Sequence, residues 1–321
     1  MARRDSMTPD DHPTAHGKKA ARNVADLRRH YDVERALADR LRASSKEERR
    51  ALYGEIYNEL FARVPDHPQL TRKVSPEKSR RKYLGEYRLI AKFTRPDSHF
   101  LEIGAGDCAL SLHVAKHVRS VTAFDVSDTI LKDIAAPANV QLRVFDGCEI
   151  PVEESSIDVA YSNQVIEHLH PDDAALQLTS VLRALRPGGC YVCVTPNRIN
   201  GPHDISQFFD TVASGLHMKE YTYRDLERLF RSLGFDGTRA CIGVKGRFFA
   251  VPVGVVAALE RLLSVLPARA RMAVGRTPLF ERLLIIRFLA RRPRSHAPES
   301  VGLISSESVR LISSESIGLI S

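Results

Sequence analysis

The stretch from Phe100 to Ser111, FLEIGAGDCALS, constrains the fold of this chain more than any other. Residues 100–103 are mostly apolar, as is typical of a buried strand, and Gly104 and Gly106 then form a tight turn. Apolar residues continue at helical spacing at Leu110, Val114 and Val118. A strand, a glycine turn and a helix in this order place backbone N–H groups against a ligand. The sequence therefore predicts a doubly wound α/β fold with a ligand beside this turn.

Glu102 separates two interpretations of this turn. Gly104, Gly106 and Ala109 also fit the fingerprint of dinucleotide-binding oxidoreductases. A carboxylate at the tip of an apolar strand, however, must face a polar or cationic group, because its burial is otherwise costly. The pattern E-x-G-x-G after a strand resembles the first motif of class I S-adenosylmethionine-dependent methyltransferases. The resemblance implies a Rossmann-like sheet of seven strands and S-adenosyl-L-methionine as the cofactor.

Later segments resemble the same family, the type 11 methyltransferase group, in order and spacing. Strands are expected at 121–125, at 140–144 and at 157–162, and LRPGGCYVCV at 185–194 resembles a later motif. The resemblance implies that Asp125 binds the ribose hydroxyls and that Asp146 lies near the adenine amino group. The residues expected at the cofactor are Glu102, Gly104, Gly106, Asp125, Asp146, Gly147 and Asn163.

The segment from Asn163 to His168, NQVIEH, follows the fourth expected strand and should border both cofactor and acceptor. Methyl transfer is an in-line displacement, and alignment of the reactants can contribute about 7–11 kcal/mol. A hydroxyl acceptor also gains from a base, which makes His168 the first candidate for catalysis. The alternative for His168 is a packing role. His203, His217 and Tyr221 are the candidates for acceptor contacts.

No metal site is expected from the motifs. Quinone O-methyltransferases carry E-x-x-E-H at this place, but here Gln164 replaces the first acid. One carboxylate and one imidazole are a poor site for a hard cation. Cys190 and Cys193 form a lone C-x-x-C inside an expected strand, where they point to opposite faces, so they do not form a zinc site.

The net charge of +8 and the pI near 9.3 favour anionic partners. The chain has neither N/D-P-P-Y nor the proline-cysteine nucleophile of enzymes that methylate nucleic acids, which disfavours nucleic acid as the substrate. The remaining acceptors are a small molecule or a lipid- or glycan-linked intermediate, with oxygen as the expected methylated atom. Five cysteines without a pairing pattern, and an N-terminus without an apolar signal segment, predict a cytoplasmic protein. The oligomeric state is not predicted by any feature.

Composition and periodicity divide the chain into four parts. Residues 1–24 form a basic arm that is expected to be disordered, and residues 25–97 form a helical region with a clear helix at 46–64. Ser75 and Pro76 predict the start of a further helix, and Thr222 with Asp225 predicts a capping box for a helix at 223–233. The methyltransferase domain is expected at 98–295. Residues 296–321 form a low-complexity tail that contains three copies of an eight-residue repeat.

An insertion is expected at about 248–276. It begins with an apolar run, 248–259, which is followed by several arginines. The run is shorter than the roughly 20 residues that span a bilayer. An interfacial helix at the inner face of the membrane is one interpretation, and a lid over the pocket or a dimer contact is the other. A non-catalytic binding module at a membrane surface, or a nucleotide-dependent oxidoreductase, is the alternative to a methyltransferase.

Overall fold

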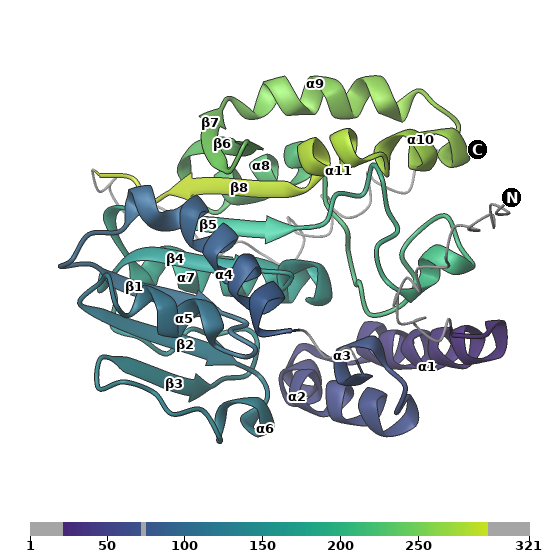
Figure 1. Ribbon diagram of the computed structural model, residues 1–321, viewed down its shortest axis with the longest axis horizontal. Coiled ribbons are helices and arrows are strands. Elements are labelled where there is room, and N and C mark those ends of the chain that lie inside the picture. The colour runs from purple at the N-terminus through teal and green to yellow at the C-terminus, as the bar shows by residue number, and fades with distance from the viewer. Residues whose placement is uncertain (1–21, 72–74, 295–321) are drawn as a thin grey trace, which may run out of the picture.

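The computed structural model describes residues 22–71 and 75–294, and its centre is a mixed sheet in the order β3-β2-β1-β4-β5-β8-β6-β7 (Figure 1). The predicted tail at 296–321 and nearly all of the predicted basic arm lie outside these residues. The strands are β1 His99–Ile103, β2 Ser120–Asp125, β3 Val140–Val144, β4 Ile157–Asn163, β5 Leu185–Thr195, β6 Asp236–Val244, β7 Arg247–Val251 and β8 Ile286–Arg291. Strands β1 to β5 are mutually parallel, and β8 runs antiparallel between β5 and β6. The doubly wound fold is confirmed.

The sheet has one strand more than the seven expected. Lys245 and Gly246 both have positive φ, as in the two-residue turns that join antiparallel strands, and Val244 pairs with Arg247 across the turn. The beginning of the long apolar run is therefore strand β7, and helix α9 starts only at Val253. The predicted interfacial helix is thus five residues shorter at its N-terminal end than the apolar run suggested.

Helices cover both faces of the sheet. They are α1 Val24–Ala43, α2 Lys46–Arg63, α3 Pro68–Thr71, α4 Pro76–Ile90, α5 Ala109–Val114, α6 Asp128–Leu131, α7 Pro171–Ala184, α8 Tyr223–Ser232, α9 Val253–Ser264, α10 Ala268–Gly275 and α11 Pro278–Leu284, with short 3-10 helices η1 Ala91–Phe93, η2 Ile166–His168 and η3 Ile205–Phe208. One core lies under α4 and α5 and contains Cys190, and the other lies under α7 and α8 and contains Cys193. The two cysteines therefore lie on opposite faces, as the alternation of a strand requires.

Capping residues start the helices where the sequence predicts. Ser75 accepts a hydrogen bond from the Lys78 amide at the start of α4, with Pro76 in the first turn. Thr222 and Asp225 form the predicted capping box of α8, and Ser45 forms another at the start of α2. The part of the chain at 46–63 is helical, which agrees with the expected helix within one residue.

Helices α1 and α2 lie beside the carboxyl ends of the strands (Figure 1). Arg49 of α2 makes two hydrogen bonds to Asp173 of α7, at 2.6 and 2.9 Å, and the Tyr53 hydroxyl donates a third at 2.7 Å. All three side chains are buried. Helix α2 is therefore fixed against the sheet layer at the edge where ligands of this fold bind.

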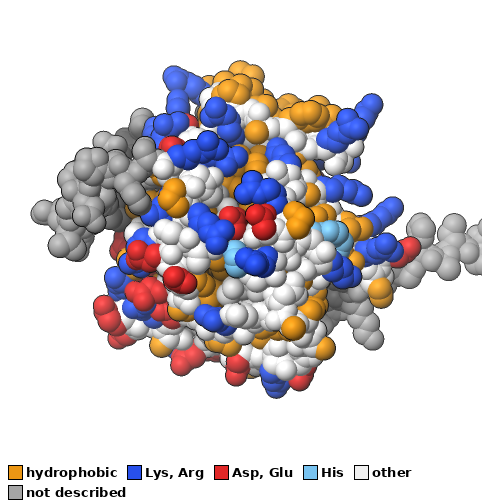
Figure 2. Space-filling view, turned by 90° about the vertical axis from the view of Figure 1, so that its left-hand side faces the viewer, with side chains coloured by type: hydrophobic (Ala, Val, Ile, Leu, Met, Phe, Trp, Pro, Cys, Tyr) orange, Lys and Arg blue, Asp and Glu red, His pale blue; other side chains and the backbone are white. Residues whose placement is uncertain are grey.

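Positive charge gathers at the amino ends of the parallel strands, opposite the ends that α1 and α2 flank. A cleft of about 450 Å³ opens there, at the amino ends of the parallel strands, and Lys and Arg side chains gather on this face (Figure 2). The basic residues that line the cleft are Lys92, Arg95, Arg186, Arg291 and Arg294. Within the described part of the chain, no helix combines the length and the apolar character that a membrane crossing requires.

Candidate active site

Two glycines shape the loop after β1 for different reasons. Gly104 has φ +71°, and a Cβ there would come within 2.4 Å of the Val165 side chain. Gly106 has φ +51°, and a Cβ there would meet no atom within 4 Å. Gly104 is thus required by close packing of the loop, whereas Gly106 faces open space beside the strand ends. A ligand can approach the backbone at Gly106.

Glu102 lies behind this loop and is buried. Its Oε2 accepts a hydrogen bond from the Ser111 hydroxyl at 2.5 Å. Burial raises the pKa of Glu102 to about 8, and the nearby Glu86 and Asp107 carboxylates act in the same direction, against the effect of Ser111. The polar partner that the sequence required for Glu102 is therefore Ser111, at the start of α5, and it ties the strand to the helix.

Asp125 closes the loop from the end of β2. Its Oδ2 accepts from the Gly106 amide at 2.9 Å and its Oδ1 from the Ser127 amide at 3.1 Å. Each carboxylate oxygen accepts one hydrogen bond in this arrangement and has a second lone pair. The carboxylate stands beside the open space at Gly106, where it can accept from a pair of hydroxyl groups.

Asp146 and Gly147 follow β3 and lie against helix α2. Asp146 accepts from Arg50 at 2.5 Å and from the backbone amides of Cys148 and Glu149 at 2.9 Å each. Burial alone raises the pKa of Asp146, but these hydrogen bonds outweigh it and lower the pKa below its ordinary value. The Tyr53 ring covers Gly147, where a Cβ would lie 3.2 Å from the ring. Helix α2 therefore forms the wall at the β3 end of the site.

Asn163, at the end of β4, contacts helix α4. Its side-chain amide donates a hydrogen bond to Glu86 of α4 at 2.7 Å. Burial raises the pKa of Glu86. Helix α4 thus contributes a carboxyl group between Asn163 and Glu102.

The segment after β4 brings a histidine against residues from a later loop. His168 Nδ1 lies 3.1 Å from the Leu216 carbonyl, and the rings of His168 and His217 have centroids 4.8 Å apart. Burial lowers the pKa of His168 to about 3, and the positive charge of a protonated His217 acts in the same direction. Glu167 is fully buried and accepts from Thr195 at 2.9 Å. His168 is therefore neutral at physiological pH.

Comparison with known proteins identifies the domain. Residues 101–193 match the sequence model of the family described as "Methyltransferase domain". A "Probable S-adenosylmethionine-dependent methyltransferase" of Mycolicibacterium smegmatis is 32% identical over 137 residues, which cover 42% of this chain and 51% of that protein. Residues 101–193 therefore belong to a methyltransferase domain, and its curated relatives are described as S-adenosylmethionine-dependent.

Another curated relative and a solved structure are similar to this chain. A protein of Mycobacterium tuberculosis with the same description is 30% identical over 155 residues, 48% of this chain and 54% of that protein. The chain thus spans about half the length of these curated relatives. Phosphoethanolamine N-methyltransferase 1 of Haemonchus contortus, solved with phosphoethanolamine and S-adenosylhomocysteine, is 12% identical and has a TM-score of 0.55, over 84% of this chain and 54% of that one. This structure has the same fold.

The methyltransferase domain brings most of the predicted site residues to one edge of the sheet. The residues that lie at or just after the carboxyl ends of β1 to β4 are Glu102, the two loop glycines, Asp125, Asp146, Gly147 and Asn163. His203 contacts the Asn197 carbonyl at 3.0 Å and donates its backbone amide to Glu220. Tyr221 is 1% exposed and belongs to the core under α7 and α8. Of the three predicted acceptor residues, the structure places His217 beside His168.

Sequence reasoning missed the contributions of α2 and α4 to this methyltransferase site. Arg50 and Tyr53 of α2 contact the residues after β3, and Glu86 of α4 contacts Asn163. The helical periodicity of α2 identified Tyr53 only as part of an apolar face. A tyrosine or an arginine on a helix carries no signal for which distant loop it meets, because that depends on tertiary packing.

Proposed function

We propose that the chain is an S-adenosylmethionine-dependent methyltransferase that acts at oxygen on a small molecule or on a lipid- or glycan-linked acceptor. The observation that carries the proposal is the placement of acids and a glycine loop at neighbouring strand ends. Asp125 ends β2, Asp146 follows β3, and Gly106, in the loop after β1, faces open space. Ligands of doubly wound folds bind at this edge.

The residues present fit the groups of the cofactor. Asp125 has lone pairs for the two ribose hydroxyls, and the Gly106 backbone admits the ligand. Asp146 stands at the adenine end, against the wall formed by α2. S-adenosylmethionine supplies an activated methyl group on a sulfonium. The chain then has to hold that methyl in line with the acceptor and exclude water, which is the larger part of the catalytic effect.

His168 is the proposed catalytic residue on the acceptor side. A carbonyl oxygen only accepts hydrogen bonds, so His168 Nδ1 donates to Leu216 and the lone pair of the neutral ring is on Nε2. A hydroxyl acceptor loses its proton on methylation, and in this proposal the Nε2 lone pair accepts that proton. A pKa of about 3 makes the ring a weak base, so that alignment supplies most of the rate.

Helix α9 supports contact with an anionic membrane surface. Val255, Leu262 and Val265 are 58%, 67% and 75% exposed, and they recur at helical spacing along one face. Hydrophobic side chains at the top of Figure 2 are flanked by Lys and Arg side chains. An apolar face with neighbouring basic residues suits the interface of an anionic bilayer, and a lipid-linked acceptor is present at such an interface.

Calorimetry tests the cofactor directly. The protein should bind both S-adenosylmethionine and S-adenosylhomocysteine, and Asp125→Ala should weaken this binding by about 1–3 kcal/mol, the effect of losing a charged hydrogen-bond partner. Asp97→Ala, an exposed acid at the opposite edge of the sheet, is the matched control and should bind normally. Tight binding of NAD with no response to either sulfur compound would contradict the proposal.

The acceptor can be found by comparing metabolites. Extracts of cells with and without the gene should differ in a compound that gains one methyl group, and the purified protein should form it from the unmethylated compound. A product methylated at nitrogen or carbon would contradict the assignment to oxygen and leave the cofactor assignment intact.

A further inference from the structure

Three side chains beside the proposed active site bring possible metal-ligand atoms close together. Glu167 and His168 belong to η2, and His217 belongs to the loop before α8. One ligand atom of each lies within 4.8 Å of the others. Glu167 and His217 are buried, and His168 is partly buried. The sequence motif did not predict this group, because His217 lies far along the chain from the NQVIEH segment.

The hydrogen bonds of the two histidines leave the same nitrogen available on each ring. His168 Nδ1 donates to the Leu216 carbonyl, which leaves a lone pair on Nε2. His217 Nδ1 lies 2.8 Å from Glu220, whose Oε1 also accepts from the His203 amide at 2.7 Å. Because Glu220 acts as an acceptor there, His217 donates from Nδ1. The neutral ring of His217 therefore also has its lone pair on Nε2.

Glu167 adds a third acceptor. Its Oε2 accepts from Thr195, but its Oε1 is buried and has no hydrogen-bond partner. Buried polar atoms are almost always paired, and an unpaired carboxylate oxygen is among the costliest exceptions. Three acceptors this close together, with no donor among them, are not a stable arrangement. A metal ion would satisfy them, and so would a proton on His217 or on Glu167, because burial raises the pKa of Glu167 to about 7.

We propose that Glu167, His168 and His217 bind one divalent transition-metal ion of the Zn²⁺ type. Two imidazoles and one carboxylate are a typical ligand set for such an ion, and three protein ligands leave a position open. The Leu216 carbonyl and the Glu220 carboxylate are the outer partners that ligating histidines use to fix their orientation. A metal-bound hydroxyl is more acidic than a free one, so the open position would suit the acceptor oxygen. His168 would then act as a metal ligand and not as the base, and this role rests on the proposed function.

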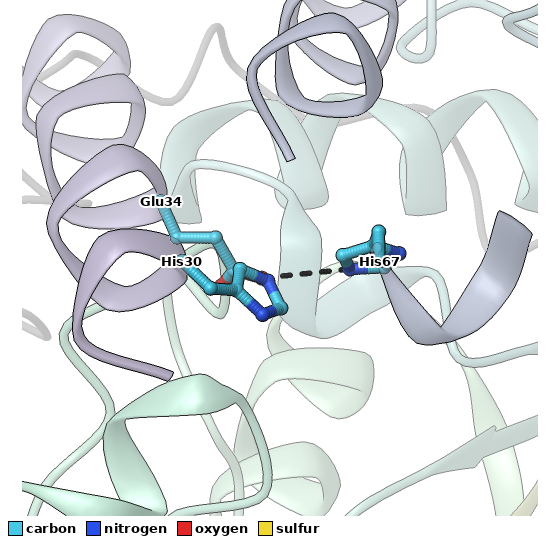
Figure 3. Close-up of side chains that lie close together, drawn as sticks. All are labelled: His30, Glu34 and His67. Carbon is cyan, nitrogen blue, oxygen red and sulfur yellow. Dashed lines mark hydrogen bonds and ion pairs between the residues drawn. The ribbon is translucent and has the colours of Figure 1, made fainter. Parts of the chain in front are cut away.

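A second cluster of the same composition provides a contrast. His30, Glu34 and His67 lie close together between α1 and α3 (Figure 3). Arg22 only donates, and it lies 2.8 Å from His30 Nδ1, so the proton of that ring is on Nε2, which donates to Glu34 at 2.7 Å. His30 has no lone pair left for a metal. This cluster is a hydrogen-bonded structural unit, and it serves as the control.

Metal content and affinity test the site without an activity assay. The full chain is treated with a chelator, desalted and titrated with Zn²⁺ in a calorimeter, and bound metal is counted by mass spectrometry. One equivalent should bind, and His217→Ala and Glu167→Gln should each abolish stoichiometric binding. Glu220→Gln should weaken it about 10- to 100-fold, as expected for a partner of a ligating histidine. His67→Gln, from the other cluster, should bind like the wild type.

The absorption spectrum of bound Co²⁺ and the melting temperature test the same site independently. Substitution with Co²⁺ should give a visible absorption band in the wild type that is missing in His217→Ala. Zn²⁺ should raise the melting temperature of the wild type and of His67→Gln but not of Glu167→Gln, which also shows whether a variant is folded. Wild-type protein that binds no metal, or a His217→Ala variant that retains it, would overturn the proposal and leave a proton on His217 or Glu167 as the group that satisfies these acceptors.

The cofactor measurement separates this inference from the proposed function. Each metal-free sample is titrated with S-adenosylhomocysteine in parallel. A protein that binds S-adenosylhomocysteine but no Zn²⁺ would refute the metal site alone, whereas a protein that binds Zn²⁺ but no S-adenosylhomocysteine would refute the methyltransferase assignment alone.

Discussion

Hydrogen-bond partners decide what each buried histidine of this chain can do. His30 and His168 both lie beside a glutamate and a second histidine. The Nδ1 lone pair of His30 accepts a hydrogen bond from Arg22, whereas Nδ1 of His168 donates to a backbone carbonyl, which leaves the Nε2 lone pair of His168 free. The sequence could identify His168 from its place after the fourth strand. It could not predict a tautomer, because Leu216 and Arg22 are brought to these rings only by tertiary packing.

Acid stability should depend on Glu34. Burial alone would raise its pKa, but hydrogen bonds from His30, His67 and the Leu216 amide outweigh it and lower the pKa to about 2, from an ordinary value of 4.5. The lowered pKa stabilises the folded state above about pH 4.5, and this contribution is lost as the pH falls toward 2. Its size is on the order of 3 kcal/mol.

Urea unfolding at a series of pH values checks this. The free energy of unfolding of Glu34→Gln should change less between pH 4.5 and 2 than that of the wild type, by on the order of 3 kcal/mol. Glu55→Gln, an exposed acid on α2, should follow the wild-type curve. Parallel curves for the wild type and Glu34→Gln would show that this carboxylate has no such effect.

The elements of the fold differ in how well the sequence predicts them. Helices α4 and α8 begin at the predicted caps, because a cap is a local hydrogen bond between residues three apart. The apolar run at 248–259 predicts one helix, but after the Lys245-Gly246 turn its first residues pair with β6 and form strand β7. Apolar residues fit a strand and a helix equally well over such a short length, so only the partner decides.

Helix α9 should bind anionic vesicles. Because residues 248–251 belong to the sheet, a point change tests the helix better than a deletion. Full-length protein should co-sediment with anionic vesicles at low salt and less at high salt, because each basic residue near the surface adds about 1 kcal/mol that salt screens. Leu262→Glu should abolish sedimentation, since it places a charge in the exposed apolar face.

The matched control for Leu262→Glu is Val144→Glu, another exposed aliphatic residue, on the edge strand β3. It should sediment like the wild type. A wild-type protein that stays in solution with anionic vesicles at low salt would assign the α9 face to a lid or a dimer contact instead.

At the scale of the whole molecule, the predicted division at residue 97 separates two parts that share buried contacts. The bonds from Arg49 and Tyr53 to Asp173 cross from α2 to α7, and Arg50 reaches the end of β3. Composition and periodicity show where helices lie along a chain, but not which helices pack on which layer. The order of the family motifs predicted the sheet, whereas the placement of the N-terminal helices had no such pattern.

Arg49→Ala should destabilise the whole molecule in a single transition. It leaves Asp173 charged and buried, which typically costs about 3–5 kcal/mol, whereas Arg49→Met combined with Asp173→Leu should recover most of that loss. Urea unfolding followed by circular dichroism measures this. Arg28→Ala, which breaks an exposed pair with Asp32, should cost less than about 1 kcal/mol. Two separate transitions in the wild type would show that the N-terminal helices unfold independently.

The anchoring of α2 also restricts the side from which a ligand can enter or leave the proposed site. Three hydrogen bonds join α2 to the buried Asp173, so moving α2 away from Asp146 would break a buried ion pair at a high cost in free energy. In the proposed site, a nucleoside that rests against this wall therefore exchanges through the open space at Gly106.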